Sequence, residues 1–409
     1  MTSTTSKRSS TKRRRTPATT RRSRLLVKVK RNSLVTRLSV IIIFLCVIGT
    51  TMVMSASSVE SLNNGSGAFS FVTEHVINLT IGAVLFLVIS RFDYRAWLKL
   101  GPIVLGVAVL MLILVLIPGI GIVRNEARRW LGVAPFVFQP SELVKFPLAI
   151  VLAGILAARE KAGELRSIRR TLLPVGCITA LISVLILKQP DFDSTLVILG
   201  LVAGMLLLVG IPKTWLLGAA VGGAALTYYQ LSEPFRRARV FVFLDPWKDP
   251  LGAGYQSIAG YTSLALGGWF GTGPGTSTAK WGFLPVAYSD FVFAVIGEEF
   301  GVAGCLAVVI GFIAFGVIGF KIALRAPDRF GTLLASGLTL TVLIQAAINI
   351  GMVVGIVPVS GLTLPFISYG GTSLVLMLSA AGILCNIAYQ GRPRVVSTKA
   401  TPKAKSSRG

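Results

Sequence analysis

The feature that most constrains this chain is a succession of apolar runs, each about as long as a bilayer-spanning helix. Such a helix needs roughly 20 mostly apolar residues, and the runs together occupy about half of the chain. Ten runs can be counted, at 36–55, 72–90, 101–118, 140–157, 171–187, 194–210, 213–230, 292–320, 333–357 and 372–390. The sequence therefore predicts an all-α polytopic membrane protein with ten transmembrane helices and no large soluble domain.

Composition supports the same class of protein. Of the 409 residues, 53% are hydrophobic and 14% are charged, which is too apolar and too poor in charge for a soluble enzyme. The four cysteines all lie inside apolar runs, where they behave as small buried hydrophobes, so we expect no disulfide framework. The single histidine, His75, has no cysteine at ligand spacing, and we expect no zinc centre.

Positive charge is concentrated at the two ends of the chain. Residues 1–38 contain 13 basic residues and residues 391–409 contain six, with no acid in either segment, out of a net charge of +25. We interpret 1–35 and 391–409 as disordered basic tails near anionic lipid, flanking a membrane domain at 36–390. Nucleic-acid binding is not indicated, because the tails are short and lack aromatic residues that would stack on bases.

The distribution of lysine and arginine also sets the orientation. With an even number of spans both termini face the same side, and their basic residues place both in the cytoplasm. The short loops 91–99, 159–170 and 321–329 are basic as well and face the cytoplasm in this arrangement. The large connection between the seventh and eighth spans, 231–291, then lies outside. Its glycine-rich, aromatic segment 267–275 predicts that it folds back over the outer face.

Two outward-facing connections carry basic residues, against the usual pattern. The first is 119–138, which contains Arg128 and Arg129, and the second is 231–291, which contains Lys280. One explanation is that long loops cross the membrane regardless of their charge. The other is a basic outer surface that binds an anionic ligand such as a phosphate, for which arginine is the natural partner.

Two ionisable residues lie inside the fourth predicted span, where charge is costly. Glu142 and Lys145 are three residues apart, which places them on one face of a helix that starts at Pro140. They form either a purely structural ion pair or part of a polar cavity that opens to the outside.

Asp290 lies where the long outer loop ends and the eighth span begins, at the boundary with water. Aspartate often caps a helix, and a capping carboxylate stays ionised as a general base must, so the two roles are compatible. Glu298 and Glu299 lie two turns deeper. An acid pair at that depth needs hydrogen-bond donors from neighbouring spans.

A further polar group is predicted near the last two spans. Gln345 and Asn349 are one turn apart on one face of the ninth span. The connection that follows, 355–373, is apolar yet dense in glycine and proline, which is typical of a re-entrant turn packed against protein. It forms either a plain buried hairpin or part of the lining of a substrate site.

Several motifs occur together and in a fixed order along residues 35–390. They are Ala127-Arg128-Arg129-Trp130, Gln139-Pro140-Ser141-Glu142 with Lys145, Gln189-Pro190-Asp191, Asp245-Pro246-Trp247, Gly252-Ala253-Gly254-Tyr255-Gln256, Leu284-Pro285 with Ser289-Asp290-Phe291, Gly297-Glu298-Glu299 and Leu364-Pro365-Phe366-Ile367-Ser368-Tyr369-Gly370-Gly371. In these motifs the chain resembles the SEDS family (shape, elongation, division and sporulation), which FtsW and RodA typify.

This resemblance implies a ten-helix peptidoglycan glycosyltransferase in the bacterial cytoplasmic membrane. Such an enzyme polymerises lipid II, a disaccharide pentapeptide on undecaprenyl pyrophosphate, at the outer face, usually with a class B penicillin-binding transpeptidase as partner. The family's catalytic aspartate corresponds to Asp290, which would take the proton of the acceptor sugar's 4-hydroxyl as undecaprenyl pyrophosphate leaves. From the resemblance and the outer basic residues we expect substrate binding by Arg128, Arg129, Gln139, Glu142, Lys145, Lys280 and Ser368.

The chain departs from the family pattern around these motifs. Val286 and Tyr288 replace a glutamate and a histidine just before Asp290. Asp193 replaces a glycine in the motif that starts at Gln189. These changes leave the carboxylate of Asp290 in place but leave open how its chemistry is tuned.

The branch of the family and some details of the function stay open. The long basic N-terminal tail and Asp245-Pro246-Trp247 favour the division branch, with divisome partners at the septum, over the elongation branch. A lipid II flippase and a division scaffold are the competing functions. Internal repeats are common in transporters, and this sequence has none that we find, which favours the enzyme. A divalent cation, Mg²⁺ or Mn²⁺, is an open question; oxygen ligands are available from Asp191, Asp193, Asp245 and Asp249.

Overall fold

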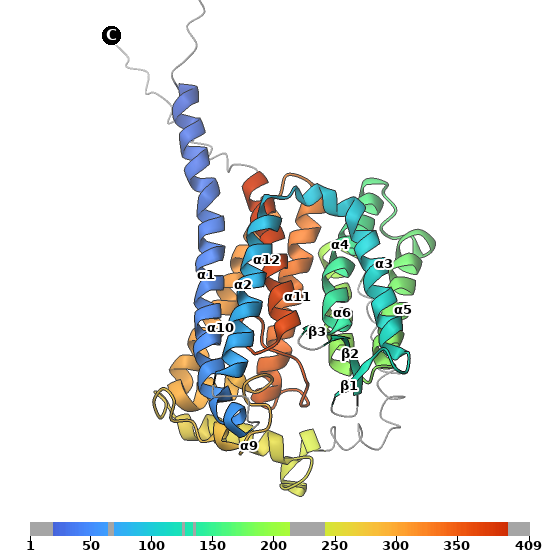
Figure 1. The fold of residues 1–409 in the computed structure, drawn as a ribbon. Helices are drawn as coiled ribbons and strands as arrows, with labels where there is room; N and C mark the ends of the chain where they lie inside the picture. Colours follow the sequence, from blue (N-terminus) through green and yellow to red (C-terminus); the bar gives the residue numbers. More distant parts are fainter. Residues whose placement is uncertain (1–18, 64–68, 125–126, 134–135, 213–241, 392–409) are drawn as a thin grey trace, which may run out of the picture.

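The computed structural model describes residues 19–63, 69–124, 127–133, 136–212 and 242–391. Long helices run side by side between two ends of the molecule (Figure 1), as predicted for a polytopic membrane protein. In this part of the chain, eight helices are long and apolar enough to cross a membrane. They are α1 (Thr19–Asn63), α2 (Ser70–Arg91), α3 (Trp97–Leu116), α4 (Pro140–Lys161), α5 (Leu173–Leu187), α10 (Val292–Leu324), α11 (Arg329–Val353) and α12 (Gly371–Gln390).

Further helices complete the described bundle. The apolar helix α6 (Phe192–Leu208) has 17 residues and corresponds to the predicted sixth span. Short turns, η1 (Tyr94–Ala96) and η2 (Ile168–Leu172), lead into α3 and α5. The predicted seventh span, 213–230, lies outside the described residues.

Two features differ from the expected chain ends and loops. The helix α1 begins at Thr19, inside the segment 1–35 that we expected to be disordered. The outer connection 119–138, expected to be a loop, contains an antiparallel sheet of β1 (Ile122–Arg124), β2 (Ala127–Val133) and β3 (Phe136–Phe138). Its strands are rich in β-branched and aromatic residues but too short for a span, so the description all-α holds for the membrane part only.

The centre of the bundle is formed by α4, α11 and α12. In the most apolar 18-residue stretch of each of these helices, 72%, 67% and 72% of the residues are buried, against 11% for α2. Polar residues on the central helices are therefore screened from lipid, while α2 presents most of its surface outward. The start of α1 and the end of α12 lie at one end of the bundle (Figure 1), which we assign to the cytoplasm from the adjoining basic tails.

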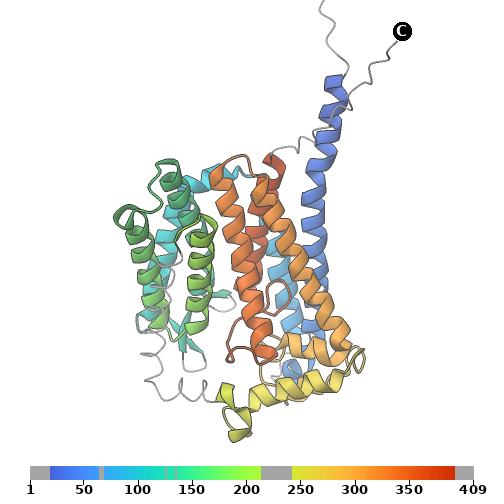
Figure 2. The same cartoon turned by 180° about the vertical axis from the view of Figure 1, so that it is seen from behind.

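The end of the bundle opposite the start of α1 is covered by the described part of the long loop (Figure 1). It contains η3 (Pro246–Lys248), α9 (Tyr255–Gly267) and η4 (Ala279–Trp281), and α9 lies across the end of the bundle (Figure 2). The loop also enters a break in α10 at Gly301, where φ is 66°. There the N–H groups of Thr272 and Gly273 donate to the carbonyl oxygens of Glu298 and Glu299, at 2.9 and 3.1 Å.

Glycine makes this close approach feasible. A methyl group on Gly271 would lie 2.1 Å from the carbonyl oxygen of Glu299, and Gly271 itself has a φ of 83°. The glycine-rich segment therefore fixes the loop against the short outer part of α10, which follows Asp290.

Candidate functional site

Asp290 lies at the outer end of the bundle, immediately before α10. The N-cap of this helix is Phe291, so Asp290 precedes the capping position that we considered for it. Its side chain is partly exposed, and Oδ1 accepts a hydrogen bond from the Ser289 hydroxyl at 2.9 Å. A ligand can therefore reach a carboxylate whose orientation is restricted by its neighbour.

The backbone of Asp290 is fixed by the connection between α11 and α12. Asn349, which is fully buried in α11, donates to the carbonyl oxygens of Asp290 and Leu362, at 2.8 and 2.6 Å. This connection packs tightly into the bundle, since a methyl group on Gly49 of α1 would lie 2.7 Å from the Cα of Ile367. It is the re-entrant turn that the sequence predicts, and it anchors Asp290.

Aromatic residues enclose the other side of the Asp290 segment. The ring of Tyr288 lies 4.8 Å from that of Phe71 and 5.6 Å from that of Tyr369, measured between centroids. Burial raises the pKa of Tyr288, and the nearby negative charges of Glu60 and Asp290 raise it further. Tyr288 is therefore a neutral hydroxyl beside Asp290 rather than a second charge.

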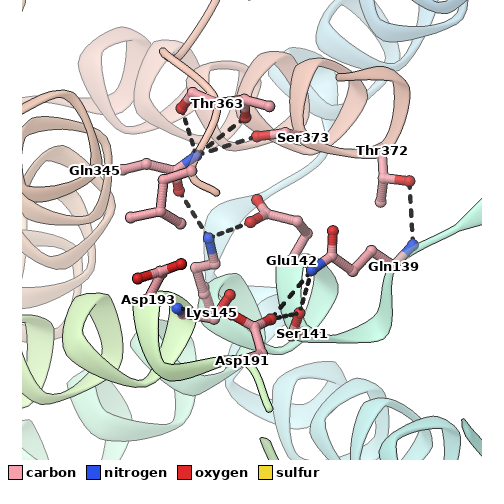
Figure 3. Close-up of polar contacts among 12 residues, drawn as sticks. Gln139, Ser141, Glu142, Lys145, Asp191, Asp193, Gln345, Thr363, Thr372 and Ser373 are labelled. Carbon is pink, nitrogen blue, oxygen red and sulfur yellow. Dashed lines mark hydrogen bonds and ion pairs between the residues drawn. The ribbon is translucent and has the colours of Figure 1, made fainter. Parts of the chain in front are cut away.

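A buried polar network lies behind the outer face (Figure 3). Lys145 Nζ donates to Glu142 Oε1 at 2.5 Å and to Gln345 Oε1 at 2.8 Å. Gln345 Nε2 in turn donates to the Thr363 carbonyl oxygen at 3.1 Å and to the Ser373 hydroxyl at 3.3 Å. Thr363 and Ser373 were not predicted as site residues, because a hydroxyl within an apolar segment is their only signal.

A second set of contacts joins α4 to the start of α6. Asp191 Oδ2 accepts hydrogen bonds from the Ser141 hydroxyl at 2.7 Å and from Gln139 Nε2 at 3.1 Å. Its Oδ1 accepts from the N–H of Ser194 at 3.1 Å and so caps α6. The carboxylate of Asp191 is thus occupied by structural partners.

Three of the buried polar atoms near these networks have no hydrogen-bond partner within the described residues. They are Glu142 Oε2, Asn349 Oδ1 and Ser194 Oγ. Buried polar atoms of this kind are usually satisfied by ordered water. Within the described residues, the protein contacts in the region between α4, α6 and α11 therefore leave some hydrogen-bonding capacity unused.

The two predicted arginines lie on β2, which is toward the same end of the bundle as α9 (Figure 1). Arg129 donates through Nε to the carbonyl oxygen of Gln189 at 3.0 Å and through Nη2 to that of Pro190. Arg128 donates through Nη1 to the carbonyl oxygen of Leu116 at 3.3 Å. Both guanidinium groups thus hold the ends of helices beside the site, and their binding of substrate stays a prediction.

The other two predicted substrate residues differ in exposure. Lys280 is on the outer loop, where Nζ donates to the carbonyl oxygen of Gly275. Ser368 is buried, and its hydroxyl accepts from the N–H of Leu364 at 2.8 Å. Ser368 therefore braces the re-entrant turn in this structure.

Glu298 and Glu299 both receive the donors that their depth requires. Glu298 accepts from the Ser277 hydroxyl at 2.6 Å and from the N–H and hydroxyl of Thr278 at 2.6 and 2.7 Å. Glu299 accepts from Ser55 of α1 at 2.5 Å. The donors to Glu298 come from the outer loop and not from a neighbouring span, so this part of the prediction was wrong.

No group of three or more His, Cys, Asp or Glu residues that could hold a metal ion occurs within the described parts of the chain. Three of the acids that we considered as ligands have local partners. Asp191 caps α6, and Asp245 Oδ2 lies 3.5 Å from Lys248 Nζ. Asp249 accepts hydrogen bonds from the N–H groups of Gly252 and Ala253. These three carboxylates are therefore engaged by partners from their own segments of the chain.

These features define a multi-pass membrane protein with a partly exposed carboxylate at its outer end and a buried polar network behind it. Residues 36–392 match the FtsW/RodA/SpoVE family, described as cell cycle protein. The chain belongs to this family.

Individual relatives agree with this assignment. The chain is 38% identical over 357 residues to stage V sporulation protein E of Bacillus subtilis, covering 87% of this chain and 97% of that protein. It is 39% identical over 353 residues to a probable peptidoglycan glycosyltransferase FtsW of Legionella pneumophila, covering 85% and 89%.

Solved structures show the same fold. A chain in a peptidoglycan synthase complex, studied for the coordination of polymerization and crosslinking, aligns with a TM-score of 0.71 at 28% identity. That alignment covers 87% of this chain and 96% of the other. The rod shape determining protein RodA of Thermus thermophilus aligns with a TM-score of 0.62 at 26% identity, covering 86% and 95%.

Proposed function

We propose that this chain is a peptidoglycan glycosyltransferase of the division type, which polymerises lipid II at the outer face of the bacterial cytoplasmic membrane. Support comes from relatives named FtsW and from the fold shared with a chain of a peptidoglycan synthase complex. The observation that carries the chemistry is the partly exposed carboxylate of Asp290, oriented by Ser289 and fixed through its backbone by Asn349.

In the proposed reaction Asp290 is the general base. The oxygen of the acceptor sugar's 4-hydroxyl attacks the anomeric carbon of the growing chain, and its proton moves to the Asp290 carboxylate. The bond between that carbon and the pyrophosphate oxygen breaks, and undecaprenyl pyrophosphate leaves with the electron pair. A carboxylate held in one orientation assists this step, because less freedom is lost when the transition state forms.

Arg128 and Arg129 are the proposed ligands of the pyrophosphate, since a guanidinium group pairs well with phosphate oxygens. Arg129 also donates to the carbonyl oxygen of Pro190, one residue before Asp191. This hydrogen bond keeps the guanidinium charge of Arg129 beside the start of α6. Lys280 on the outer loop is the third proposed cation. Gln139, Glu142, Lys145 and Ser368 are proposed to form the polar wall of the substrate cavity.

We further propose a class B penicillin-binding transpeptidase as the partner, together with divisome proteins at the septum. A structural relative acts within a peptidoglycan synthase complex in which polymerization and crosslinking are coordinated. A polymerase that releases uncrosslinked strands needs such a partner close to its outer face.

The test is reconstitution of the purified full chain in vesicles with lipid II, with and without the transpeptidase. We expect glycan polymer from the unchanged protein and none from Asp290→Asn, because the amide cannot accept the proton. Asp93→Asn, the same change at the cytoplasmic end of α2, is the control and should polymerise normally.

Two outcomes would contradict this function. Polymer from Asp290→Asn, with the variant folded, would remove Asp290 as the base. Lipid II crossing the bilayer without any polymer from the unchanged protein would favour the flippase instead.

A further inference from the structure

A second carboxylate lies beside Asp290 and comes from a different helix. Asp193, in the first turn of α6, accepts a hydrogen bond at Oδ2 from the N–H of Gly361 at 2.9 Å. A methyl group on Gly361 would lie 3.8 Å from Asp290 Oδ2 and 3.9 Å from Asp193 Oδ2. The two carboxylates therefore flank the same point on the re-entrant turn.

This arrangement is held on both sides. Asp193 follows Asp191, which caps α6 and is bonded to α4, so the first turn of α6 is fixed. Asp290 and the turn are joined by Asn349, which donates to both Asp290 and Leu362. Since Gly361 is exposed and both acids are partly exposed, the two carboxylates face a point that water and substrate can reach.

We propose that Asp193 is a positioning residue whose negative charge raises the proton affinity of Asp290 and so strengthens it as a base. The reason is electrostatic: protonation of one carboxylate relieves repulsion with the other, so the proton is held more tightly. A base that holds a proton more tightly removes it more readily from a sugar hydroxyl. This inference rests on the proposed role of Asp290.

Other titratable groups lie around Tyr288, two residues before Asp290. Tyr288 and Tyr369 are the phenols, and Tyr369 donates to Glu74 of α2 at 2.6 Å. Glu60 of α1 adds negative charge on the Tyr288 side. Lys145 belongs to the buried network that reaches the same turn through Gln345, and its Nζ is paired with Glu142 Oε1 at 2.5 Å. Asp193 is thus the acid that shares a contact point with Asp290.

The experiment measures the initial rate of lipid II polymerisation against pH for the unchanged protein and for Asp193→Asn. Asparagine keeps an oxygen that can accept from Gly361 and removes only the charge. Because the base must be ionised, the rate rises with pH over the range in which the Asp290 carboxyl group loses its proton. We expect the midpoint of this rise to move down by about one pH unit in Asp193→Asn. A shift of this size is expected for two carboxylates that each lie within 4 Å of the same point.

Two further variants make the result interpretable. Asp193→Ala removes both the charge and the acceptor, and we expect the same shift of the midpoint with an added loss of rate at every pH. Asp93→Asn, at the cytoplasmic end, should leave the midpoint unchanged. Thermal unfolding of each purified variant establishes that it is folded.

The failure of this inference is distinguishable from failure of the proposed function. A midpoint that is unchanged or moves upward in a folded Asp193→Asn protein overturns the role of Asp193, even while Asp290→Asn remains inactive. So does an Asp193→Asn protein that is folded but inactive at every pH. Polymerisation by Asp290→Asn overturns the proposed base, and the role of Asp193 falls with it.

Discussion

Replacing Lys145 with methionine tests how the buried ion pair contributes to the bundle. The ammonium group is fully buried, the Glu142 side chain is 8% exposed, and the two lie 2.5 Å apart. Lys145→Met would leave the Glu142 carboxylate buried without its cation, and Oε2 has no hydrogen-bond partner among the residues that the structure describes. Breaking a buried pair from one side costs about 3–5 kcal/mol, whereas an exposed pair is worth at most about 1 kcal/mol.

The measurement is equilibrium unfolding of the purified protein in mixed micelles. We expect Lys145→Met to lower the free energy of unfolding by about 3–5 kcal/mol. The double variant Glu142→Gln/Lys145→Met should recover most of this loss, because no uncompensated charge is left and methionine fills a volume similar to that of the lysine stem. The recovery separates loss of charge balance from loss of packing.

Two results would refute this reasoning. A loss below about 1 kcal/mol for Lys145→Met would mean that water screens the pair as at a surface. A double variant less stable than Lys145→Met would mean that the geometry of the side chains, and not the balance of charge, dominates. Glu160→Gln, which removes one member of the half-exposed Arg329 pair at the cytoplasmic end, is the matched control with a small expected effect.

Two further predictions concern the outer arginines and the cytoplasmic end. Arg129→Lys keeps the charge but loses the fork that spans the Gln189 and Pro190 carbonyls, so we expect a KM for lipid II raised several-fold with a smaller change in kcat; an unchanged KM with a lowered Tm would make Arg129 purely structural. Burial of Asp328 favours its neutral form, but hydrogen bonds from Tyr94, Gly331 and Arg95 outweigh it and lower the pKa below the usual 3.8. Its stabilising effect is therefore complete above about pH 4 and is lost as pH falls through the lowered value, so the Tm of Asp328→Asn should fall less on acidification than that of the unchanged protein.

The membrane-spanning helices could be predicted from the sequence because each apolar run has only one way to satisfy its backbone in lipid. Nine of the ten predicted spans correspond to helices in the described residues, and the seventh lies outside them. The break in α10 was not predicted, because it depends on a loop segment more than 20 residues away whose N–H groups bond to the carbonyl oxygens at the break.

The individual site residues were predictable, but their partners were not. Glu142 and Lys145 carry charge inside a span, where charge is costly, and Asp290 lies where a polar loop meets a span, so all three are visible in a sequence. The contacts of Asp193 with Gly361 and of Gln345 with Thr363 join segments from different helices, and no local pattern encodes such distances. The arginines of β2 were expected to face a ligand, while their contacts to the helix ends could not be anticipated without the sheet.

Three consecutive residues of the re-entrant turn connect these separate parts. Gly361 donates to Asp193 of α6, Leu362 accepts from Asn349 of α11, and Thr363 accepts from Gln345, which also binds Lys145 of α4. Asp290 is held to the same turn through Asn349. A shift of the turn would therefore move the base relative to both Asp193 and the ion pair. The buried pair and the outer carboxylates are thus parts of one hydrogen-bonded unit, in which the orientation of the base depends on residues of three other helices.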